Sequence, residues 1–109
     1  MKLNYVIKYV ADMERAIAFY KNQLGFVVRF TSSDWSEFQT GETTIALHGA
    51  SKEHAAGTFS LGFGVDDLDA FYRETKDKLE FTSSPTETFG TRIARFRDVD
   101  GVECSVSSR

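Results

Sequence analysis

The sequence has 109 residues, among them only one proline, one cysteine and two histidines. Few of its residues can therefore form disulfide bonds or bind a metal ion through imidazole or thiolate groups. Because Cys104 is the single cysteine, no disulfide can form within the chain and no cysteine-rich zinc site can be built. The chain also lacks an apolar run of the about 20 residues that a membrane-spanning helix needs, and its N-terminus lacks a signal-peptide pattern. We therefore expect a cytoplasmic protein that makes no use of a membrane.

An excess of basic charge is missing as well. Thirteen Lys and Arg residues stand against sixteen Asp and Glu residues, giving a net charge of −3, whereas a nucleic-acid-binding domain shows a basic patch. The apolar share of 41% is too high for a disordered chain. Aromatic residues are abundant, with ten Phe, four Tyr and one Trp. We expect some rings to fill the core and others to line a pocket for a small organic ligand.

An internal repeat organises the chain. Segments 5–26 and 60–81 align without a gap. Segments 45–48 and 104–107, near the ends of the two copies, also correspond. The matched positions of the first pair are Val10 with Val65, Asp12 with Asp67, Met13 with Leu68, Leu24 with Leu79, and Phe26 with Phe81. A repeat of this kind is the signature of a duplicated structural unit. The sequence predicts one domain over residues 1–109, made of two modules at about 1–49 and 57–109.

Each module is expected to have the order β-α-β-β-β, which makes the protein α+β in class. In the first module Asp12 can cap a helix that ends at Gly25, and a hairpin crosses the turn Gly41-Glu42. In the second module Asp67 can cap the helix. The expected strands cover 3–10, 26–30, 36–40, 43–48, 58–65, 80–83, 92–97 and 102–107, and the expected helices cover about 13–24 and 68–79.

Two connections of the second module complete this prediction. Residues 84–90, with Phe89 near their end, form a loop that serves either as a mobile lid or as a plain connection. The last hairpin crosses the four residues 98–101. Cys104 alternates to the core side of the last strand, where it is predicted to be a small buried hydrophobic residue.

The capped helix that ends in Phe-Tyr-x-x-x-Leu-Gly-Phe, the Asp-x-x-Gly turn and the doubling together resemble the vicinal oxygen chelate superfamily, which contains glyoxalase I, bleomycin-resistance proteins and extradiol dioxygenases. Segment 10–26 carries most of this resemblance, with support from 65–79 and 98–101. The resemblance implies two βαβββ modules whose curved mixed sheets form a cleft, with the helices packed outside. It also implies a homodimer.

The resemblance further implies four positions for ligands to a divalent metal ion. One lies on the first strand and one on the last strand of each module, and they fall on Tyr5, Ala46, Ser60 and Ser105. Divalent cations prefer imidazole, thiolate, carboxylate or amide oxygen, which these residues do not supply. We therefore expect no bound metal and no other cofactor.

Strand alternation sorts the remaining side chains between the cleft and the core. A two-residue turn at Gly41-Glu42 pairs Glu37 with Ala46 and Trp35 with His48, leaving Phe38 and Leu47 beneath the helix. The same reasoning places Arg92, Ala94, Phe96, Ser105 and Ser107 in the cleft of the second module. The predicted ligand-binding residues are Tyr5, Tyr9, Trp35, Glu37, His48, Ser60, Arg92, Phe96 and Ser105.

Plainer roles stay open for several of these residues. Glu37 can point to solvent, His48 can lie at the hairpin end, and Arg92 can pair with Glu103 or with a helix end. Trp35 can belong to a dimer interface, and Tyr5 and Tyr9 can belong to the core.

Four functions remain in competition. The first is a small-molecule-binding protein of the bleomycin-resistance or glyoxalase-like type, which sequesters an amphipathic or aromatic ligand in an aromatic cleft without a metal. The second is a metal-free lyase or isomerase-type enzyme that uses Glu37 or His48 as its general base. A metalloenzyme of the glyoxalase I or dioxygenase type ranks last, because the residues at the four expected metal positions are poor ligands. A structural or regulatory protein whose cleft is filled by its own side chains is the remaining alternative.

Overall fold

The computed structural model describes residues 1–88 and 90–109, which form eight strands, two α-helices and one π-helix. Contacts divide the chain into two units: Tyr5–Phe59, called the N-terminal unit, and Met1–Asn4 with Ser60–Arg109, called the C-terminal unit. The α+β class is confirmed. Phe89, which the sequence places near the end of a loop, lies outside the described residues. Among the described helices, none has the length and hydropathy to cross a membrane.

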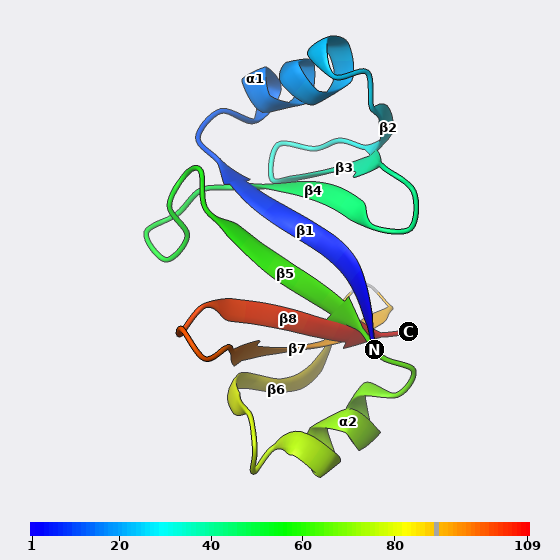
Figure 1. The fold of residues 1–109 in the computed structure, drawn as a ribbon, viewed down its shortest axis with the longest axis vertical. Helices are drawn as coiled ribbons and strands as arrows, with labels where there is room; N and C mark the ends of the chain where they lie inside the picture. Colours follow the sequence, from blue (N-terminus) through cyan, green and yellow to red (C-terminus); the bar gives the residue numbers. More distant parts are fainter. Residues whose placement is uncertain (89) are drawn as a thin grey trace. The chain divides into compact units, whose positions relative to one another are not determined.

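The N-terminal unit repeats the predicted order of elements. Its strands line up as β2-β3-β4-β1, with β1 and β4 parallel and the other neighbours antiparallel, so the sheet is mixed. Figure 1 shows α1 beside this sheet, and α1 contacts β4. The elements are β1 (Lys2–Val10), α1 (Met13–Ala18), the π-helix η1 (Phe19–Gln23), β2 (Val27–Phe30), β3 (Trp35–Gln39) and β4 (Thr44–Gly49).

The turn at Gly41-Glu42 sets the register of β3 on β4 as the sequence predicts. Glu37 lies opposite Ala46 and Trp35 lies opposite His48. Phe38 and Leu47 are fully buried in one cluster with Val10, on which the side chains of α1 pack. The sheet therefore has a helix face filled by apolar side chains, and an opposite face that carries Trp35, Glu37, Ala46 and His48.

The predicted continuous helix over 13–24 is wrong in its second half. The backbone N–H of Leu24 donates to the carbonyl of Phe19 at 3.1 Å, an i to i−5 bond that defines a π-turn. The wider turn rotates Leu24 out of the apolar face, so that this side chain is 51% exposed. Tyr20 stays in the core, with its ring centroid 5.7 Å from that of Phe38. Gly25, at φ 75°, ends the segment as predicted.

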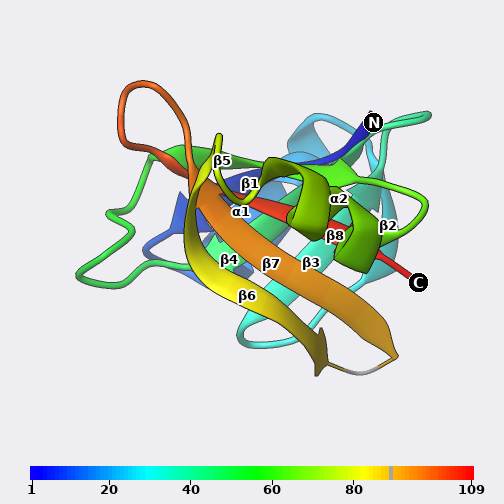
Figure 2. The same ribbon diagram turned by 90° about the horizontal axis from the view of Figure 1, so that it is seen from below.

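The C-terminal unit has the strand order β5-β8-β7-β6, with β5 and β8 parallel and the other neighbours antiparallel. Helix α2 contacts β6, β7 and β8, as Figures 1 and 2 show from two sides. The apolar cluster beneath it contains Leu68, Ala94, Phe96, Cys104 and Val106. The elements are β5 (Phe59–Gly64), α2 (Leu68–Thr75), β6 (Glu80–Thr88), β7 (Thr91–Arg97) and β8 (Glu103–Ser108).

The loop predicted over 84–90, with its optional role as a lid, is wrong over its described first part. Strand β6 continues from Glu80 to Thr88 and pairs with β7, with register shifts between Phe81 and Ser83 and between Ser83 and Thr86. Pro85 lies within the second irregularity, on the outermost strand of its sheet. A proline is tolerated at an edge strand or a bulge because no ladder hydrogen bond is required from it there.

The last hairpin is one residue out of the predicted register. Arg97 pairs with Glu103 and Phe96 pairs with Cys104, so the connection has five residues, 98–102, and not four. Asp98 holds this longer turn, since its Oδ1 accepts from the backbone N–H of Asp100 at 2.9 Å and of Val102 at 3.0 Å. A shift of one residue moves every side chain of the strand to the other face.

The two modules begin their helices in the same way. Asp12 Oδ1 accepts from the backbone N–H of Arg15, and Asp67 Oδ1 accepts from that of Ala70, both at 3.1 Å. Both aspartates are extended, with φ near −134° and −138°. The matched caps support the internal repeat at the level of individual atoms.

Replacing Asp67 by alanine is expected to lower the free energy of unfolding by about 1 kcal/mol, because one N-terminal N–H of α2 loses its acceptor. Urea denaturation followed by circular dichroism measures the effect. Asp66→Ala, which removes the preceding exposed carboxylate, is the matched control and is expected to change stability by less than about 0.5 kcal/mol. Equal losses in the two variants would contradict the capping role.

Candidate functional site

The face of the N-terminal sheet opposite α1 is rich in aromatic rings. Every second residue of β1, β3 and β4 points to it, and Ile7, Tyr9 and Ala46 form its buried centre with Tyr5 and Trp35 packed around them. This surface is called the aromatic face, and its residues are Tyr5, Ile7, Tyr9, Trp35, Glu37, Ala46 and His48.

The rings of the aromatic face form one continuous row. The centroid of Trp35 lies 5.9 Å from that of Tyr5, at an interplanar angle of 69°, and 5.9 Å from that of His48, at 84°. Tyr9 follows, 5.4 Å from His48, and it stacks on His54 at 4.3 Å with the planes 5° apart. Edge-to-face and stacked pairs at these distances hold the rings in fixed orientations.

Glu37 provides the negative charge on this face. Its Oε2 accepts from Nε1 of Trp35 at 2.8 Å, and its Oε1 lies 3.7 Å from Nη1 of Arg29. Its side chain is 18% exposed. Arg29 also donates to Oγ1 of Thr44 at 2.9 Å. The carboxylate is thereby fixed beside the indole ring, and it is still reachable from solvent.

His48 is oriented by the backbone of its own strand end. Its Nδ1 lies 2.8 Å from the carbonyl oxygen of Gly49. Because a carbonyl oxygen can only accept, Nδ1 carries the proton of this bond, and in the neutral imidazole Nε2 then bears the lone pair. The exposed ring therefore presents a hydrogen-bond acceptor next to Trp35 and Tyr9.

Two residues that contact the aromatic face, Arg29 and His54, are not among the ligand-binding residues predicted from the sequence. Arg29 follows Val28, which packs on the helix side, so strand alternation alone would have placed Arg29 on the same face as Glu37. His54 lies in the connection between β4 and β5, where no periodic pattern indicates which way a side chain points. Its stacking on Tyr9 is a tertiary contact without a local signal.

The other predicted ligand-binding residues belong to the C-terminal unit. Ser60 is buried on β5, and Ser105 lies opposite Gly62 and Arg95. The structure brings Tyr5, Tyr9, Trp35, Glu37 and His48 together on one face of the other unit.

The predicted placement of Arg92, Ala94 and Phe96 on the same face as Ser105 is wrong, and Ala94 is buried with Phe96 in the cluster beneath α2. Phe96 packs in the cluster beneath α2, with its ring 5.9 Å from Phe81. Arg92 reaches α2, where its Nη2 donates to Oδ1 of Asp69 at 2.7 Å. Ser105 alternates with Cys104 of that cluster and points to the opposite face. The cause is the five-residue turn at 98–102, which inverts β7 relative to the prediction.

Cys104 is a buried structural residue, as predicted. Burial raises the pKa of its thiol above the ordinary value, and the negative charge of Asp98 adds to the shift. The thiol is therefore held in its neutral form at neutral pH. A neutral buried thiol is a poor nucleophile, so Cys104 is not a candidate for catalysis.

Comparison with known proteins decides the family. The sequence model of the Glyoxalase/Bleomycin resistance protein/Dioxygenase superfamily matches residues 2–106. The chain belongs to this superfamily. The uncharacterized protein YurT of Bacillus subtilis (strain 168) is 32% identical, over 93% of this chain and 94% of that protein.

Solved structures share the fold of this chain. A member from Vibrio splendidus 12B01 is 16% identical, with a TM-score of 0.67 and coverage of 95% of both chains. A methylmalonyl-CoA epimerase in complex with methylmalonyl-CoA and NH4⁺ is 19% identical, with a TM-score of 0.81, 98% of this chain and 93% of that chain being covered. At these identities the likeness establishes the glyoxalase-type α+β fold alone.

The residues at the metal positions implied by the superfamily resemblance do not fit a divalent metal ion. Ala46 is fully buried and brings no donor, and Tyr5, Ser60 and Ser105 bring a phenol and two hydroxyl groups. The residues paired with Ala46 and Ser105 across the parallel ladders are Ile7 and Gly62, which add no ligand. Within residues 1–88 and 90–109, no group of three or more His, Cys, Asp or Glu side chains is arranged to hold a metal.

Proposed function

We propose that this superfamily member is a small-molecule-binding protein, which holds a flat aromatic or amphipathic organic molecule on its aromatic face without a metal ion. The observation that carries the proposal is the pair formed by Trp35 and Glu37, in which the indole N–H and the carboxylate oxygen are 2.8 Å apart. A ring platform with a fixed charge beside it is the combination that small-molecule sites use to bind and to orient a ligand.

The chemistry of the face favours a ligand with one ring and one cationic or hydrogen-bond-donating group. The ring can stack in the row that Tyr5, Trp35 and His48 begin, and a cation can lie within reach of both the indole face and Glu37. Arg29 already lies 3.7 Å from the carboxylate, so a cationic group on the ligand competes with a weak ion pair. To reach the carboxylate, the ligand has to displace only this contact with Arg29.

A thermal-shift screen of small aromatic compounds tests the proposal, with benzyltrimethylammonium as the cationic probe and benzyl alcohol as its neutral counterpart. Glu37→Gln is expected to weaken benzyltrimethylammonium binding about tenfold, by loss of the charge, while benzyl alcohol binds as before. Gln retains an oxygen that can accept from Trp35.

Glu42→Gln, in the turn between β3 and β4, is the matched control and is expected to leave both affinities unchanged. Isothermal titration measures the dissociation constants. A cationic probe that binds Glu37→Gln and the unaltered protein equally well would contradict the role of the carboxylate. If no compound of the screen stabilised the protein, this result would contradict the binding function itself.

A second candidate is a metal-free enzyme of the lyase or isomerase type, favoured by the geometry of His48. The hydrogen bond from Nδ1 to the carbonyl of Gly49 leaves Nε2 suited to accept a proton, and Glu37 lies on the same face. Turnover of a screened ligand that persists in EDTA and is lost in His48→Gln or Glu37→Gln would favour this candidate. Binding without turnover favours the first.

We further propose that the protein is cytoplasmic and works as a homodimer. The edge strand β2 supports the second point, because Val27 and Phe30 expose more than half of their surface at the end of the sheet. An exposed apolar edge strand favours association with a second chain.

A further inference from the structure

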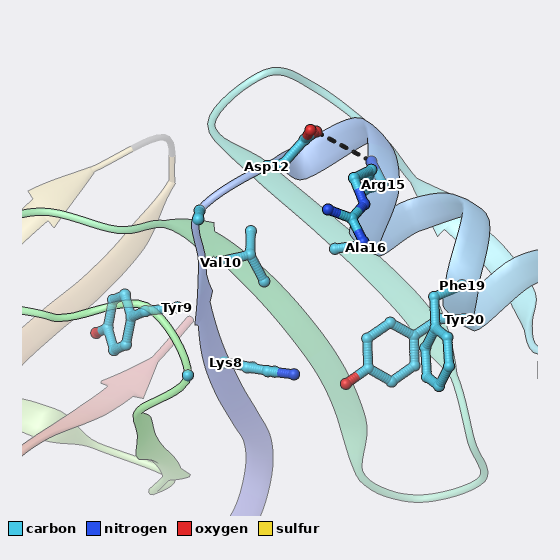
Figure 3. A pocket seen from close by; sticks show the side chains of 10 residues that line it. Lys8, Tyr9, Val10, Asp12, Arg15, Ala16, Phe19 and Tyr20 are labelled. Atoms are coloured by element: carbon cyan, nitrogen blue, oxygen red, sulfur yellow. Dashed lines mark hydrogen bonds between the residues drawn. The ribbon is translucent and has the colours of Figure 1, made fainter.

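A separate groove lies on the helix side of the N-terminal unit, bordered by β1, the start of α1 and the π-helix (Figure 3). Its cavity volume is about 390 Å³, within the range of about 300–1,000 Å³ of sites for small organic molecules. We call it the α1 groove and define it by Lys8, Asp12, Arg15, Ala16, Phe19 and Tyr20. Tyr9 also contributes to its wall, but the ring of Tyr9 is stacked on His54.

The charged groups of the α1 groove leave it cationic. Lys8 places its ammonium 5.8 Å from the centroid of Tyr20 and 5.9 Å from that of Phe59, and it forms no ion pair with any described residue. The guanidinium of Arg15 likewise has no carboxylate partner in the described part of the chain. The one acidic residue, Asp12, directs its Oδ1 to the backbone N–H of Arg15, away from Lys8 (Figure 3).

The aromatic wall of the groove comes from the first two residues of η1, Phe19 and Tyr20. Phe19, the first residue of η1, is 42% exposed, and its ring meets that of Tyr20 edge to face at 5.2 Å. Both residues border the groove, and Tyr20 also packs on Phe38 in the core. Single π-turns are frequent at functional sites.

We propose that the α1 groove binds a small organic anion that has an aromatic ring and one carboxylate. The carboxylate lies between the ammonium of Lys8 and the guanidinium of Arg15, and the ring lies against Phe19 and the methyl group of Ala16. Two cationic residues from different elements, β1 and α1, and one carboxylate, that of Asp12, border this groove, in a protein whose net charge is −3. This site is distinct from the aromatic face, which favours cations because of Glu37.

The test uses 2-naphthoate as the anionic probe and 2-naphthamide as its neutral isostere. Isothermal titration is expected to show saturable binding of 2-naphthoate and at least about tenfold weaker binding of 2-naphthamide, because the amide cannot form charge-assisted hydrogen bonds. Lys8→Gln and Arg15→Gln are each expected to weaken 2-naphthoate binding about tenfold, or about 1.4 kcal/mol.

Lys21→Gln is the matched control, since Lys21 lies on η1 and does not border the groove, and it is expected to change the affinity less than twofold. A second measurement locates the probe without substitution: amide resonances of residues 8, 15, 19 and 20 are expected to shift in a two-dimensional NMR titration. Equal binding of the amide, equal weakening by Lys21→Gln, or shifts confined to the aromatic face would each overturn the proposal. The last result would leave the proposed function intact.

Discussion

Replacing Phe96 by alanine is expected to lower the free energy of unfolding by about 3–5 kcal/mol, the range for truncating a buried phenylalanine. Phe96 is 9% exposed and its ring lies 6.3 Å from Phe63 and 5.9 Å from Phe81. Removing the ring leaves a cavity beneath α2, which the surrounding strands cannot close without breaking their ladder. Urea denaturation measures the loss, and the variant is expected to bind aromatic ligands normally at conditions where it remains folded.

Arg95→Ala is the control for Phe96, because Arg95 is the neighbouring residue of β7 and is exposed. It is expected to change stability by less than about 0.5 kcal/mol. If Phe96→Ala kept full stability and instead lost ligand binding, the ring would face a ligand, and the register of β7 on β8 described above would be wrong.

Replacing Trp35 by alanine is expected to weaken ligand binding to the aromatic face about 30- to 150-fold, or about 2–3 kcal/mol, as for aromatic residues that anchor a bound partner. The substitution removes the centre of the ring row between Tyr5 and His48. It also removes the N–H that fixes the carboxylate of Glu37. Isothermal titration with benzyltrimethylammonium measures the loss.

Trp35→Phe separates the two contributions of the indole. It keeps a ring and lacks the donor, so it is expected to recover most of the affinity and to leave only a several-fold loss. The thermal midpoint of both variants serves as the folding control. Unchanged affinity in a folded Trp35→Ala protein would show that the aromatic face is not the binding surface.

The sequence could predict the register of β3 on β4 because this hairpin closes through two residues. A turn as short as Gly41-Glu42 permits one register, and the pairing of Glu37 with Ala46 follows from it. The caps at Asp12 and Asp67 are equally local, since each depends on a side chain and a backbone N–H three residues apart. Trp35, Glu37 and His48 share one face for this reason, and Tyr5 and Tyr9 lie on the same face through the parallel pairing of β1 with β4.

The predictions that proved wrong concern segments where the deciding contact is not local, or where a turn is one residue longer than expected. The turn at 98–102 differs from a four-residue turn by the hydrogen bond from Val102 to Asp98, and that single residue reversed the placement of Arg92 and Phe96. The π-turn after Ala18 has no signature in an apolar pattern of helical spacing. Pro85 favours a loop over residues 84–90, whereas an edge strand with bulges accommodates it.

The central claim, that an organic ligand binds at Trp35 and Glu37 without a metal, is tested most directly by the indole N–H resonance of the single tryptophan. This proton is donated to Glu37 at 2.8 Å, so a ligand that engages either group must move the signal. We predict a saturable shift with benzyltrimethylammonium, or with the best aromatic compound of the screen, that is unchanged by EDTA. A ligand that stabilises the protein without moving this resonance, or a shift that EDTA abolishes, would contradict the account.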